Sequence, residues 1–160
     1  MSIFTIGYEG LNIDNFLALL RSGCVETVVD IRELPLSRKR GFSKNGLRDM
    51  LNAHGFAYRH MSELGCPKPI RDQYRQDGDW QRYKKDFKRY LSLKNDVIAD
   101  LSEMAGSSNC ALLCFEANYR MCHRSMVADA VHLAYGIEVA HLQAGTVKTA
   151  TTANRPEALA

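Results

Sequence analysis

The densest group of reactive side chains in the sequence lies in residues 114–125, which read CFEANYRMCHRS. Cys122 and His123 fall where a helix is expected to begin, and a helix N-terminus favours anions and the thiolate form of cysteine. Cys122 is therefore a candidate nucleophile, with His123 as a proton donor and Arg124 as an anion clamp. The alternative is structural, and for each thiol taken singly we prefer it, because packed cysteines are common.

Cys114 and Arg120 match the cysteine, five residues, arginine spacing of cysteine phosphatases. That chemistry needs small loop residues whose N–H groups cradle a phosphate, and the bulky and acidic side chains between these two residues oppose it. Cys114, Cys122 and His123 are also metal-ligand types, but an adjacent cysteine and histidine lack the spacing of ordinary zinc sites. We therefore expect no metal and no other cofactor.

The carboxylates Glu116 and Asp30 are better candidates for proton transfer. A carboxylate in a partly buried cleft beside an arginine such as Arg32 can act as a general base or can anchor a ribose. A buried ion pair that only fixes the loops explains the same residues equally well. The basic residues 38–40 could grip phosphates, although so short a run is usually solvated surface.

Strands and helices are predicted to alternate around these residues. Apolar runs predict buried strands at residues 2–7, 25–31, 56–60, 110–115 and 137–142. Helical spacing predicts helices between them, with Asn12 and Ser43 as N-caps and with aromatic residues facing the core after residue 80. Residues 63–79, rich in glycine, proline and charge, are predicted to form a long connection or lid. The pattern indicates a three-layer α/β/α domain with a mostly parallel, open sheet of about five strands, Rossmann-like or flavodoxin-like.

In such sheets, ligands bind outside the carboxyl ends of the strands. The residues that follow the predicted strands are more reactive than the strand bodies: Tyr8, Glu9, Asp30, Arg32, His60, Cys114, Glu116 and His141. We interpret the histidines at positions 60 and 141 as satisfied core or rim residues. The others predict a functional cleft at this edge of the sheet.

The composition limits the class of protein. With 160 residues, 46% of them hydrophobic, the chain has the size of one domain. A formal charge of +3 is too small to indicate a dedicated nucleic-acid binder. Five cysteines, of which Cys24, Cys110 and Cys114 lie in or beside apolar runs, favour buried thiols in a reducing compartment. No leader or membrane-length apolar run is visible. We expect a cytoplasmic protein with a domain over residues 1–143 and a flexible tail over 144–160.

Four ordered motifs resemble one known family. They are TIGYEG, VVDIRELPLSR, MSELG and CFEANYRMCHRSMVAD, and together they are similar to the domain of unknown function 488, from about Phe4 to about His141. Members often have histidine at the position of Tyr8 and a proline in the loop that here reads Asn118 to Met121. The resemblance implies the α/β fold, the site and a cytoplasmic location, and it implies no settled activity.

These observations lead us to expect an enzyme, a hydrolase or transferase, that acts on a small anionic substrate, phosphate-bearing or nucleotide-derived, or on a nucleic-acid end. The expected catalytic residues are Cys114, Glu116, Cys122 and His123, and the expected substrate-binding residues are Tyr8, Asp30, Arg32, Ser37 and Arg124. One alternative is a non-catalytic regulatory module that binds a nucleotide or nucleic acid. Another is thiol, redox or cysteine-phosphatase-like chemistry. No membrane partner is expected, and the oligomeric state stays open.

Overall fold

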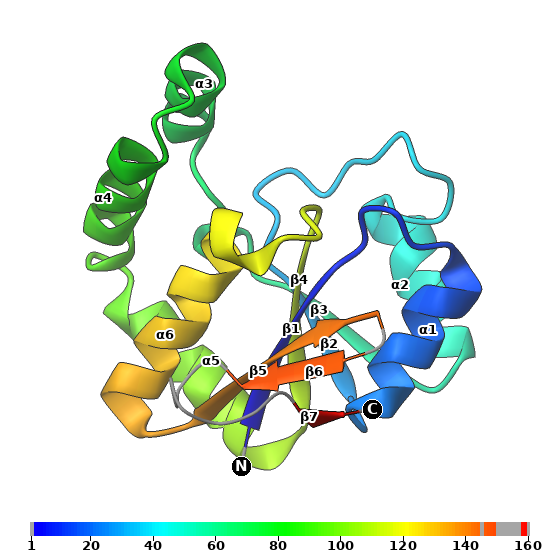
Figure 1. The fold of residues 1–160 in the computed structure, drawn as a ribbon. Helices are drawn as coiled ribbons and strands as arrows, with labels where there is room; N and C mark the ends of the chain where they lie inside the picture. The colour runs from blue at the N-terminus through cyan, green and yellow to red at the C-terminus, as the bar shows by residue number, and fades with distance from the viewer. Residues whose placement is uncertain (1, 145, 150–157, 160) are drawn as a thin grey trace.

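Five parallel strands form the centre of the sheet in the order β3-β2-β4-β1-β5 (Figure 1). The computed structural model describes residues 2–144, 146–149 and 158–159. The parallel strands are β1 (Ser2–Gly7), β2 (Thr27–Asp30), β3 (Ala57–His60), β4 (Cys110–Cys114) and β5 (Glu138–Gln143). Two antiparallel strands, β6 (Thr146–Thr149) and β7 (Ala158–Leu159), extend the sheet beyond β5. The predicted mostly parallel sheet is confirmed.

The strand order differs from those of the Rossmann and flavodoxin folds. In those folds the strands run 3-2-1-4-5 and 2-1-3-4-5, so β1 and β2 are neighbours. Here β4 lies between β1 and β2 and pairs with both of them. The carboxyl ends of β1, β2 and β4 therefore lie side by side, which brings together the residues that follow three strands distant in sequence.

Helices cover both faces of the sheet, which confirms the three-layer arrangement (Figure 1). One face packs against α1 (Ile13–Ser22) and α2 (Lys44–Ala53), and the other against α4 (Trp80–Leu91), α5 (Asn95–Ser107) and α6 (His123–Tyr135). All five residues of β4 are buried, with Leu112 in the core on the α6 side and Leu113 in the core on the α1 side. A strand covered on both faces reads as a continuous apolar run, as this one does.

The starts of α1 and α2 follow different chemistry. The side chain of Asn12 accepts a hydrogen bond of 2.7 Å from the backbone N–H of Asn15, as the sequence predicts. Ser43 occupies the N-cap position of α2, but its hydroxyl makes no capping bond. It donates to the carbonyl of Ser37 and accepts from the backbone N–H of the same residue, so it fixes the preceding loop instead.

The predicted long connection over residues 63–79 is wrong, because most of it is helical. A 3-10 turn, η1 (Ser62–Leu64), leads into α3 (Lys68–Asp77), which ends at Gly78 with a φ of 62°. Pro67 and Pro69 stand at the N-cap and in the first turn, where a missing N–H costs nothing. Helix α3 packs beside α4 on the side toward which the strands' carboxyl ends point (Figure 1).

Cys24 also departs from its expected place, because it is exposed. It lies in the turn between α1 and β2 with a φ of 53°. The apolar residues on either side of it, Leu20 and Val25, are buried, whereas its own side chain is not. Much of the predicted tail, namely residues 145, 150–157 and 160, lies outside the described residues, and β6 and β7 are the described parts of it. Within the described residues, no helix has the length and apolarity to cross a membrane.

Candidate functional site

A cavity of about 1020 Å³ opens at the carboxyl ends of the central strands. Its floor includes Cys114, Glu116 and His123. Its cationic lining residues are Arg32, Arg38, Lys39, Arg71 and Arg75, and its aromatic ones are Tyr8, Tyr74, Trp80, Tyr83 and Phe115. The sequence-predicted cleft is therefore present, with an additional wall from α3 and α4.

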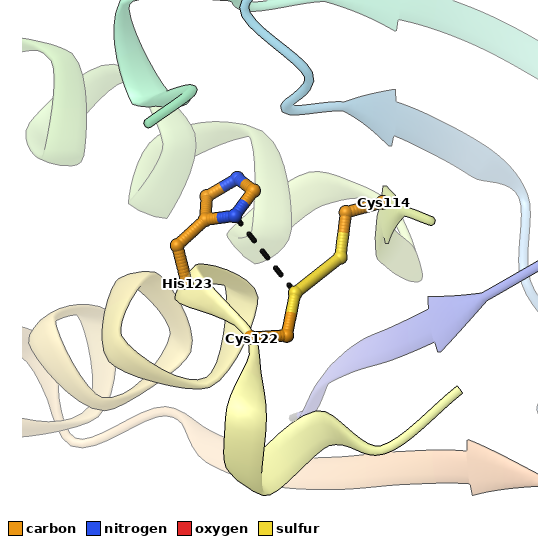
Figure 2. A group of neighbouring side chains, drawn as sticks. All are labelled: Cys114, Cys122 and His123. Atoms are coloured by element: carbon orange, nitrogen blue, oxygen red, sulfur yellow. Dashed lines mark hydrogen bonds between the residues drawn. A yellow bond between two sulfur atoms is a disulfide. The ribbon is translucent and has the colours of Figure 1, made fainter. Parts of the chain in front are cut away.

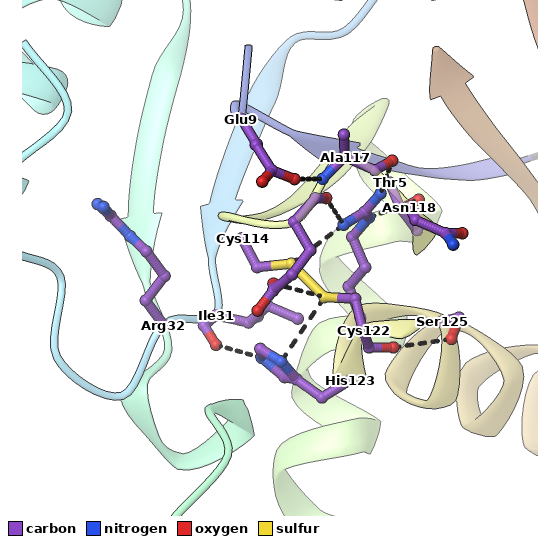
Figure 3. The surroundings of a disulfide bond; sticks show 12 residues. Thr5, Glu9, Ile31, Arg32, Cys114, Ala117, Asn118, Cys122, His123 and Ser125 are labelled. Carbon is purple, nitrogen blue, oxygen red and sulfur yellow. Dashed lines mark hydrogen bonds between the residues drawn. A yellow bond between two sulfur atoms is a disulfide. The ribbon is translucent and has the colours of Figure 1, made fainter. Parts of the chain in front are cut away.

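The two cysteines of the predicted site meet at this floor. Their sulfur atoms form a disulfide between the end of β4 and the start of α6 (Figure 3). The Sγ atom of Cys122 lies 3.2 Å from Oε2 of Glu116, a separation at which the reduced thiol donates a hydrogen bond to the carboxylate. Burial raises the pKa of Glu116 above its ordinary value and outweighs a backbone hydrogen bond and the charge of Arg124, which lower it. Among the described residues, the other three cysteines are free.

His123 presents a lone pair to these sulfur atoms. Its Nε2 lies 2.8 Å from the backbone carbonyl of Ile31, so this nitrogen carries the proton and donates. Its Nδ1 lies 3.8 Å from Sγ of Cys122 (Figure 2). Burial lowers the pKa of His123 to about 4, so the ring is neutral at neutral pH. The sequence analysis expected His123 to be a proton donor. In this geometry its Nδ1 is instead a hydrogen-bond acceptor or a metal ligand.

Arg124 lies beneath the cleft, with 0% of its surface exposed. Its guanidinium donates to the carbonyls of Glu116 and Ala117, to Sγ of Cys114 and to the hydroxyl of Thr5. Burial lowers its pKa to about 10, so it stays cationic at neutral pH. It does not line the cavity, and it ties the Glu116 loop to β1 rather than clamping an anion.

Gly7 allows the Glu116 loop to reach this position. A Cβ at residue 7 would overlap the carbonyl of Glu116 and lie 3.0 Å from the guanidinium of Arg124. Only glycine leaves room for so close a backbone approach. Gly7, the first glycine of the TIGYEG motif, therefore has a packing role at the site.

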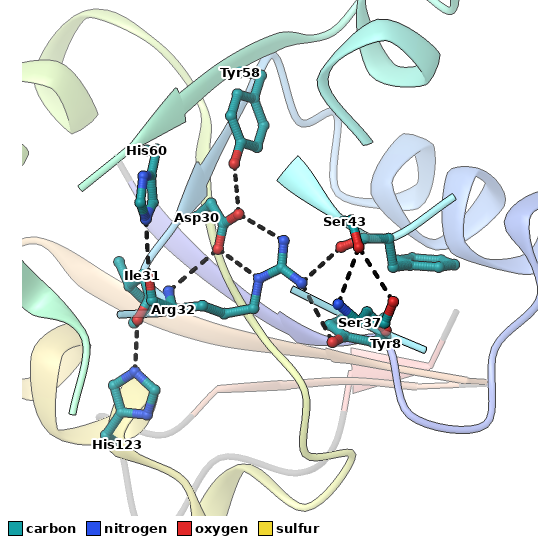
Figure 4. A network of polar contacts seen from close by, with 10 residues as sticks. Tyr8, Asp30, Ile31, Arg32, Ser37, Ser43, Tyr58, His60 and His123 are labelled. Carbon is teal, nitrogen blue, oxygen red and sulfur yellow. Dashed lines mark hydrogen bonds and ion pairs between the residues drawn. The ribbon is translucent and has the colours of Figure 1, made fainter. Parts of the chain in front are cut away.

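Asp30 and Arg32 form a buried pair at the end of β2 (Figure 4). Nε and Nη2 of Arg32 donate to the two carboxylate oxygens of Asp30 at 2.8 and 2.7 Å. The hydroxyl of Tyr58 donates to the same carboxylate, and burial together with this bond raises the pKa of Tyr58. Arg32 also donates to the carbonyl of Phe42 and to the hydroxyl of Tyr8. Asp30 thus positions Arg32, and only Arg32 of the pair lines the cavity.

The remaining predicted binding residues, Tyr8 and Ser37, both line the cavity. Tyr8 stacks on Phe42, with their ring centroids 4.6 Å apart. The hydroxyl of Ser37 accepts from the backbone N–H of Lys39 at 3.0 Å. Lys39 in turn donates from Nζ to the carbonyl of Tyr8, so the loop after β2 is joined to the end of β1.

The C-x5-R spacing does not form a phosphate cradle. Arg120 is exposed and its guanidinium lies over the ring of Tyr119, while Arg124 occupies the place beside Cys114. The backbone N–H of Ala117 donates to the carboxylate of Glu9, and that of Arg120 to the side chain of Asn118. These loop N–H groups are therefore occupied by the protein itself.

The wall built by α3 and α4 is the part that the sequence interpretation missed. Trp80 and Tyr83 stack with their centroids 4.7 Å apart, and Tyr74 of α3 meets both rings. Arg71 and Arg75 project from α3 into the lining. The sequence does contain a pattern that predicts α3. Ile70 and Tyr74 have helical spacing, two prolines precede them and Gly78 follows, which is typical of a short amphipathic helix.

His141 confirms the interpretation as a satisfied core histidine. It is buried, its ring stacks on Tyr119 at 3.7 Å, and its Nδ1 lies 2.6 Å from the hydroxyl of Thr5. Burial, and then the charges of Arg124 and Arg120, lower its pKa to about 3. It is therefore neutral in the folded protein throughout the neutral and mildly acidic range.

This lowered pKa predicts a loss of stability in acid. His141 takes up its proton near pH 6.5 in the unfolded chain and only near pH 3 in the folded chain. Its contribution to the free energy of unfolding is therefore fully present above pH 6.5 and is lost as the pH decreases from 6.5 to 3. His123, whose pKa is lowered to about 4, adds a decrease of the same sign that both proteins keep. The free energy of unfolding of wild type, measured by urea unfolding, should therefore fall more steeply with decreasing pH than that of His141→Asn, by up to about 1.4 kcal/mol per pH unit. Equal pH dependence of the two proteins between pH 7 and pH 4 would contradict the assignment.

Comparison with known proteins identifies a family without an activity. A family model described as "Domain of unknown function DUF488" matches residues 12–131. The match includes the ends of β2 and β4, the Glu116 loop and most of α6. No curated protein and no solved structure matches the chain.

Proposed function

Because this chain belongs to the family of the domain of unknown function DUF488, whose description names no activity, we propose its function from the cleft alone. The protein is an enzyme that acts on an anionic substrate bearing an aromatic base, a nucleotide or the end of a nucleic acid. The observation that carries this proposal is the meeting of a half-buried carboxylate, two cysteine sulfurs and a histidine at the floor of a cationic, aromatic cleft.

The charge of the cleft favours an anion. Five cationic side chains line it against two carboxylates, Glu33 and Glu116. Glu33 is already paired with Arg71 at 2.7 Å, which leaves the field of the rim cationic. Arg38 and Arg75 are exposed, and Arg75 has only a solvent-exposed ion pair of 3.8 Å with Asp72. Both guanidinium groups can therefore turn to a phosphate from solvent. A cleft lined mainly by one sign of charge also concentrates ligands of the opposite sign.

The aromatic residues favour a planar base. Tyr8 and Phe115 form one group, in which the Phe115 ring is 46% exposed. Tyr74, Trp80 and Tyr83 form the other, on α3 and α4. Aromatic faces beside cationic groups are the usual means of holding nucleotides, since every base can stack and every phosphate carries charge. The cavity is at the upper end of the size range of small-molecule sites, so it accommodates more than a phosphate alone.

Glu116 supplies the proton transfer in this proposal. It comes from the loop after β4, it lines the cleft, and burial raises the pKa of its carboxyl group, which makes the carboxylate a stronger base. Arg124 holds the backbone of this loop from below, so the carboxylate is positioned before a substrate arrives. Hydrolysis or group transfer, in which a nucleophile must lose a proton, is the reaction class that this arrangement serves.

A second function, thiol–disulfide exchange, is favoured by one observation. Cys114 and Cys122 are joined in a disulfide and Cys114 lines the cavity. In such an exchange a substrate dithiol would be oxidised to its disulfide while this pair is reduced to two thiols, or the reverse. The cationic and aromatic walls have no part in that reaction, so we place it second.

The test of the proposed function is ligand binding by calorimetry, with nucleoside monophosphates, nucleosides and inorganic phosphate as separate probes. Nucleoside monophosphates should bind more tightly than either part alone. Trp80→Ala should weaken that binding by about 5- to 100-fold through lost stacking, and Arg75→Ala by about tenfold through a lost charged hydrogen bond.

Two exposed residues outside the cleft provide matched controls. Arg48→Ala removes a cation from α2 and Tyr135→Ala removes an aromatic ring from the end of α6. Both should bind as wild type. The proposal fails if no probe binds, or if the cleft variants bind as well as these controls do.

A further inference from the structure

Three side chains at the floor of the cleft have the donor set of a zinc site. We propose that the reduced protein binds one Zn²⁺ ion through Sγ of Cys114, Sγ of Cys122 and Nδ1 of His123. These three atoms lie within 4.8 Å of one another, and all three residues are buried. Thiolate and imidazole are the ligands that zinc prefers among protein groups.

The backbone removes the objection that an adjacent cysteine and histidine cannot share a metal. Cys122 is the N-cap of α6 with extended dihedrals, φ −142° and ψ 144°, and His123 is the first helical residue. This change of conformation points both side chains to one place, with Sγ and Nδ1 3.8 Å apart (Figure 2). In a tetrahedral zinc site, bonds of about 2.3 Å to sulfur and about 2.0 Å to nitrogen put these atoms about 3.5 Å apart.

His123 is oriented as a metal ligand needs to be. Its Nε2–H donates to the carbonyl of Ile31 at 2.8 Å, which leaves the lone pair of Nδ1 directed at the sulfur atoms. A metal-bound histidine usually donates its other ring N–H to a carbonyl or carboxylate in this way. The ring of Phe87 packs edge-on against the imidazole, with centroids 5.4 Å apart, and so limits its rotation.

The separation of the two cysteines also suits a shared metal. Their Cα atoms are 7.9 Å apart, wider than the roughly 4.4–6.8 Å that is usual between disulfide-linked residues. Two thiolates on one tetrahedral zinc have sulfur atoms about 3.8 Å apart, which a wider backbone separation accommodates. The disulfide must first take two electrons from a thiol reductant to give the two thiols. Metal binding by the reduced pair then releases two protons.

The charges around the site balance in the metal-bound form. Arg124 is a fully buried cation whose Nη1 lies 3.2 Å from Sγ of Cys114, and among the described residues no carboxylate forms an ion pair with it. A zinc ion with two thiolates is neutral overall, and it leaves Arg124 and Glu116 as one positive and one negative group. The guanidinium then donates to a thiolate sulfur, a contact that also stabilises ligating sulfur.

Three protein ligands leave a fourth position of the metal open, as in catalytic zinc sites. Cys114, His123 and Glu116 all line the cavity, so this position faces the substrate and the carboxylate. Water there would give a proton to Glu116 while its oxygen forms the new bond to the electrophilic atom of the substrate. The bond to the leaving group breaks and Glu116 returns the proton to it. This use of the metal rests on the proposed function, whereas the binding of the metal does not.

The test is titration of the reduced, chelator-treated full chain with Zn²⁺ alone and with Co²⁺ alone, with no substrate present. One ion should bind per chain, and Co²⁺ should give the strong visible absorption of a tetrahedral thiolate site. Cys114→Ser and His123→Ala should each weaken Zn²⁺ binding by at least about 100-fold.

Each of these variants has a matched control on the same kind of element. Cys110→Ser changes another buried cysteine of β4, and His60→Ala removes another histidine whose ring bonds a backbone carbonyl after β2. Both should bind Zn²⁺ as wild type. Should a ligand variant fail to fold, residue-resolved alkylation of wild type replaces it: Zn²⁺ should protect Cys114 and Cys122 and leave Cys24 reactive.

The inference is overturned if the reduced, folded wild type binds neither ion, if it binds them without protecting these two thiols, or if the folded ligand variants bind as the controls do. If the protein binds nucleoside monophosphates but no metal ion, the zinc site is wrong and the proposed function stands. Metal binding by a chain whose cleft takes none of those probes would leave the zinc site standing and remove the proposed function.

Discussion

Replacing Glu116 with glutamine is expected to slow turnover of the cleft's substrate by about 10²- to 10⁴-fold, the usual contribution of a positioned general base. Substrate affinity should change little, because glutamine keeps the shape and the hydrogen-bonding oxygen of the side chain. The carboxylate is the part that is lost, and with it the only cleft carboxylate that is not paired with an arginine side chain in the described structure. Steady-state kinetics beside calorimetry separates the two effects.

The matched control for this variant is Glu33→Gln. Glu33 also lines the cleft, but Arg71 holds its carboxylate at 2.7 Å. Its replacement should leave turnover within a few-fold of wild type. Equal activity of Glu116→Gln and wild type would remove the assigned role. If wild type binds ligands but never forms a product, the alternative of a non-catalytic nucleotide- or nucleic-acid-binding module is favoured.

Arg124→Lys is expected to lower the free energy of unfolding by about 2–5 kcal/mol, the range for buried polar groups left without partners. Arginine reaches four acceptors at once through a planar fork, and a lysine ammonium at one point cannot reproduce that geometry. The carbonyls of Glu116 and Ala117 and the hydroxyl of Thr5 would then lack their donor. Urea unfolding at neutral pH measures the change directly.

Arg120→Lys makes the same substitution in the same loop at an exposed position. It should shift the unfolding free energy by less than about 0.5 kcal/mol, as surface changes usually do. A comparably small effect of Arg124→Lys would mean that the loop holds its shape without the buried guanidinium, and the positioning argument for Glu116 would lose its support.

Much of the fold followed from the sequence because its local patterns and its packing agree. The apolar run at residues 110–114 reads as a strand buried on both faces, and it is one. Asn12 caps the start of α1 in the structure as the pattern predicts. The convergence of Tyr8, Arg32 and Cys114 also followed, since parallel strands place their carboxyl ends at one edge.

Other features depend on tertiary packing and were out of reach. The order of strands in a sheet is not written in the alternation of strands and helices, so the insertion of β4 between β1 and β2 could not be read from it. Arg124 is in the first turn of a helix, where a long side chain can point to solvent or inward. Gly7 leaves the room that the inward guanidinium needs, because a Cβ there would lie 3.0 Å from its Nη1.

The error over residues 63–79 has a different cause. Prolines are usually a sign that no helix is present, but Pro67 and Pro69 stand where a helix tolerates them. As a consequence, the wall of the cleft that bears Arg75 and Trp80 was not foreseen. Where prolines precede apolar residues at helical spacing, the first turn of a helix is the better interpretation.

Trp80 is the only tryptophan of the sequence, and it lies half-buried in the wall of the cleft. Its indole ring is stacked on Tyr83, and Tyr83 stacks on Phe87 farther along α4. Phe87 in turn packs against the imidazole of His123, at the start of α6. The molecule thus carries its single indole fluorophore at the place where a ligand would arrive. Its emission reports on occupancy of the cleft in the unlabelled protein, without interference from any second indole.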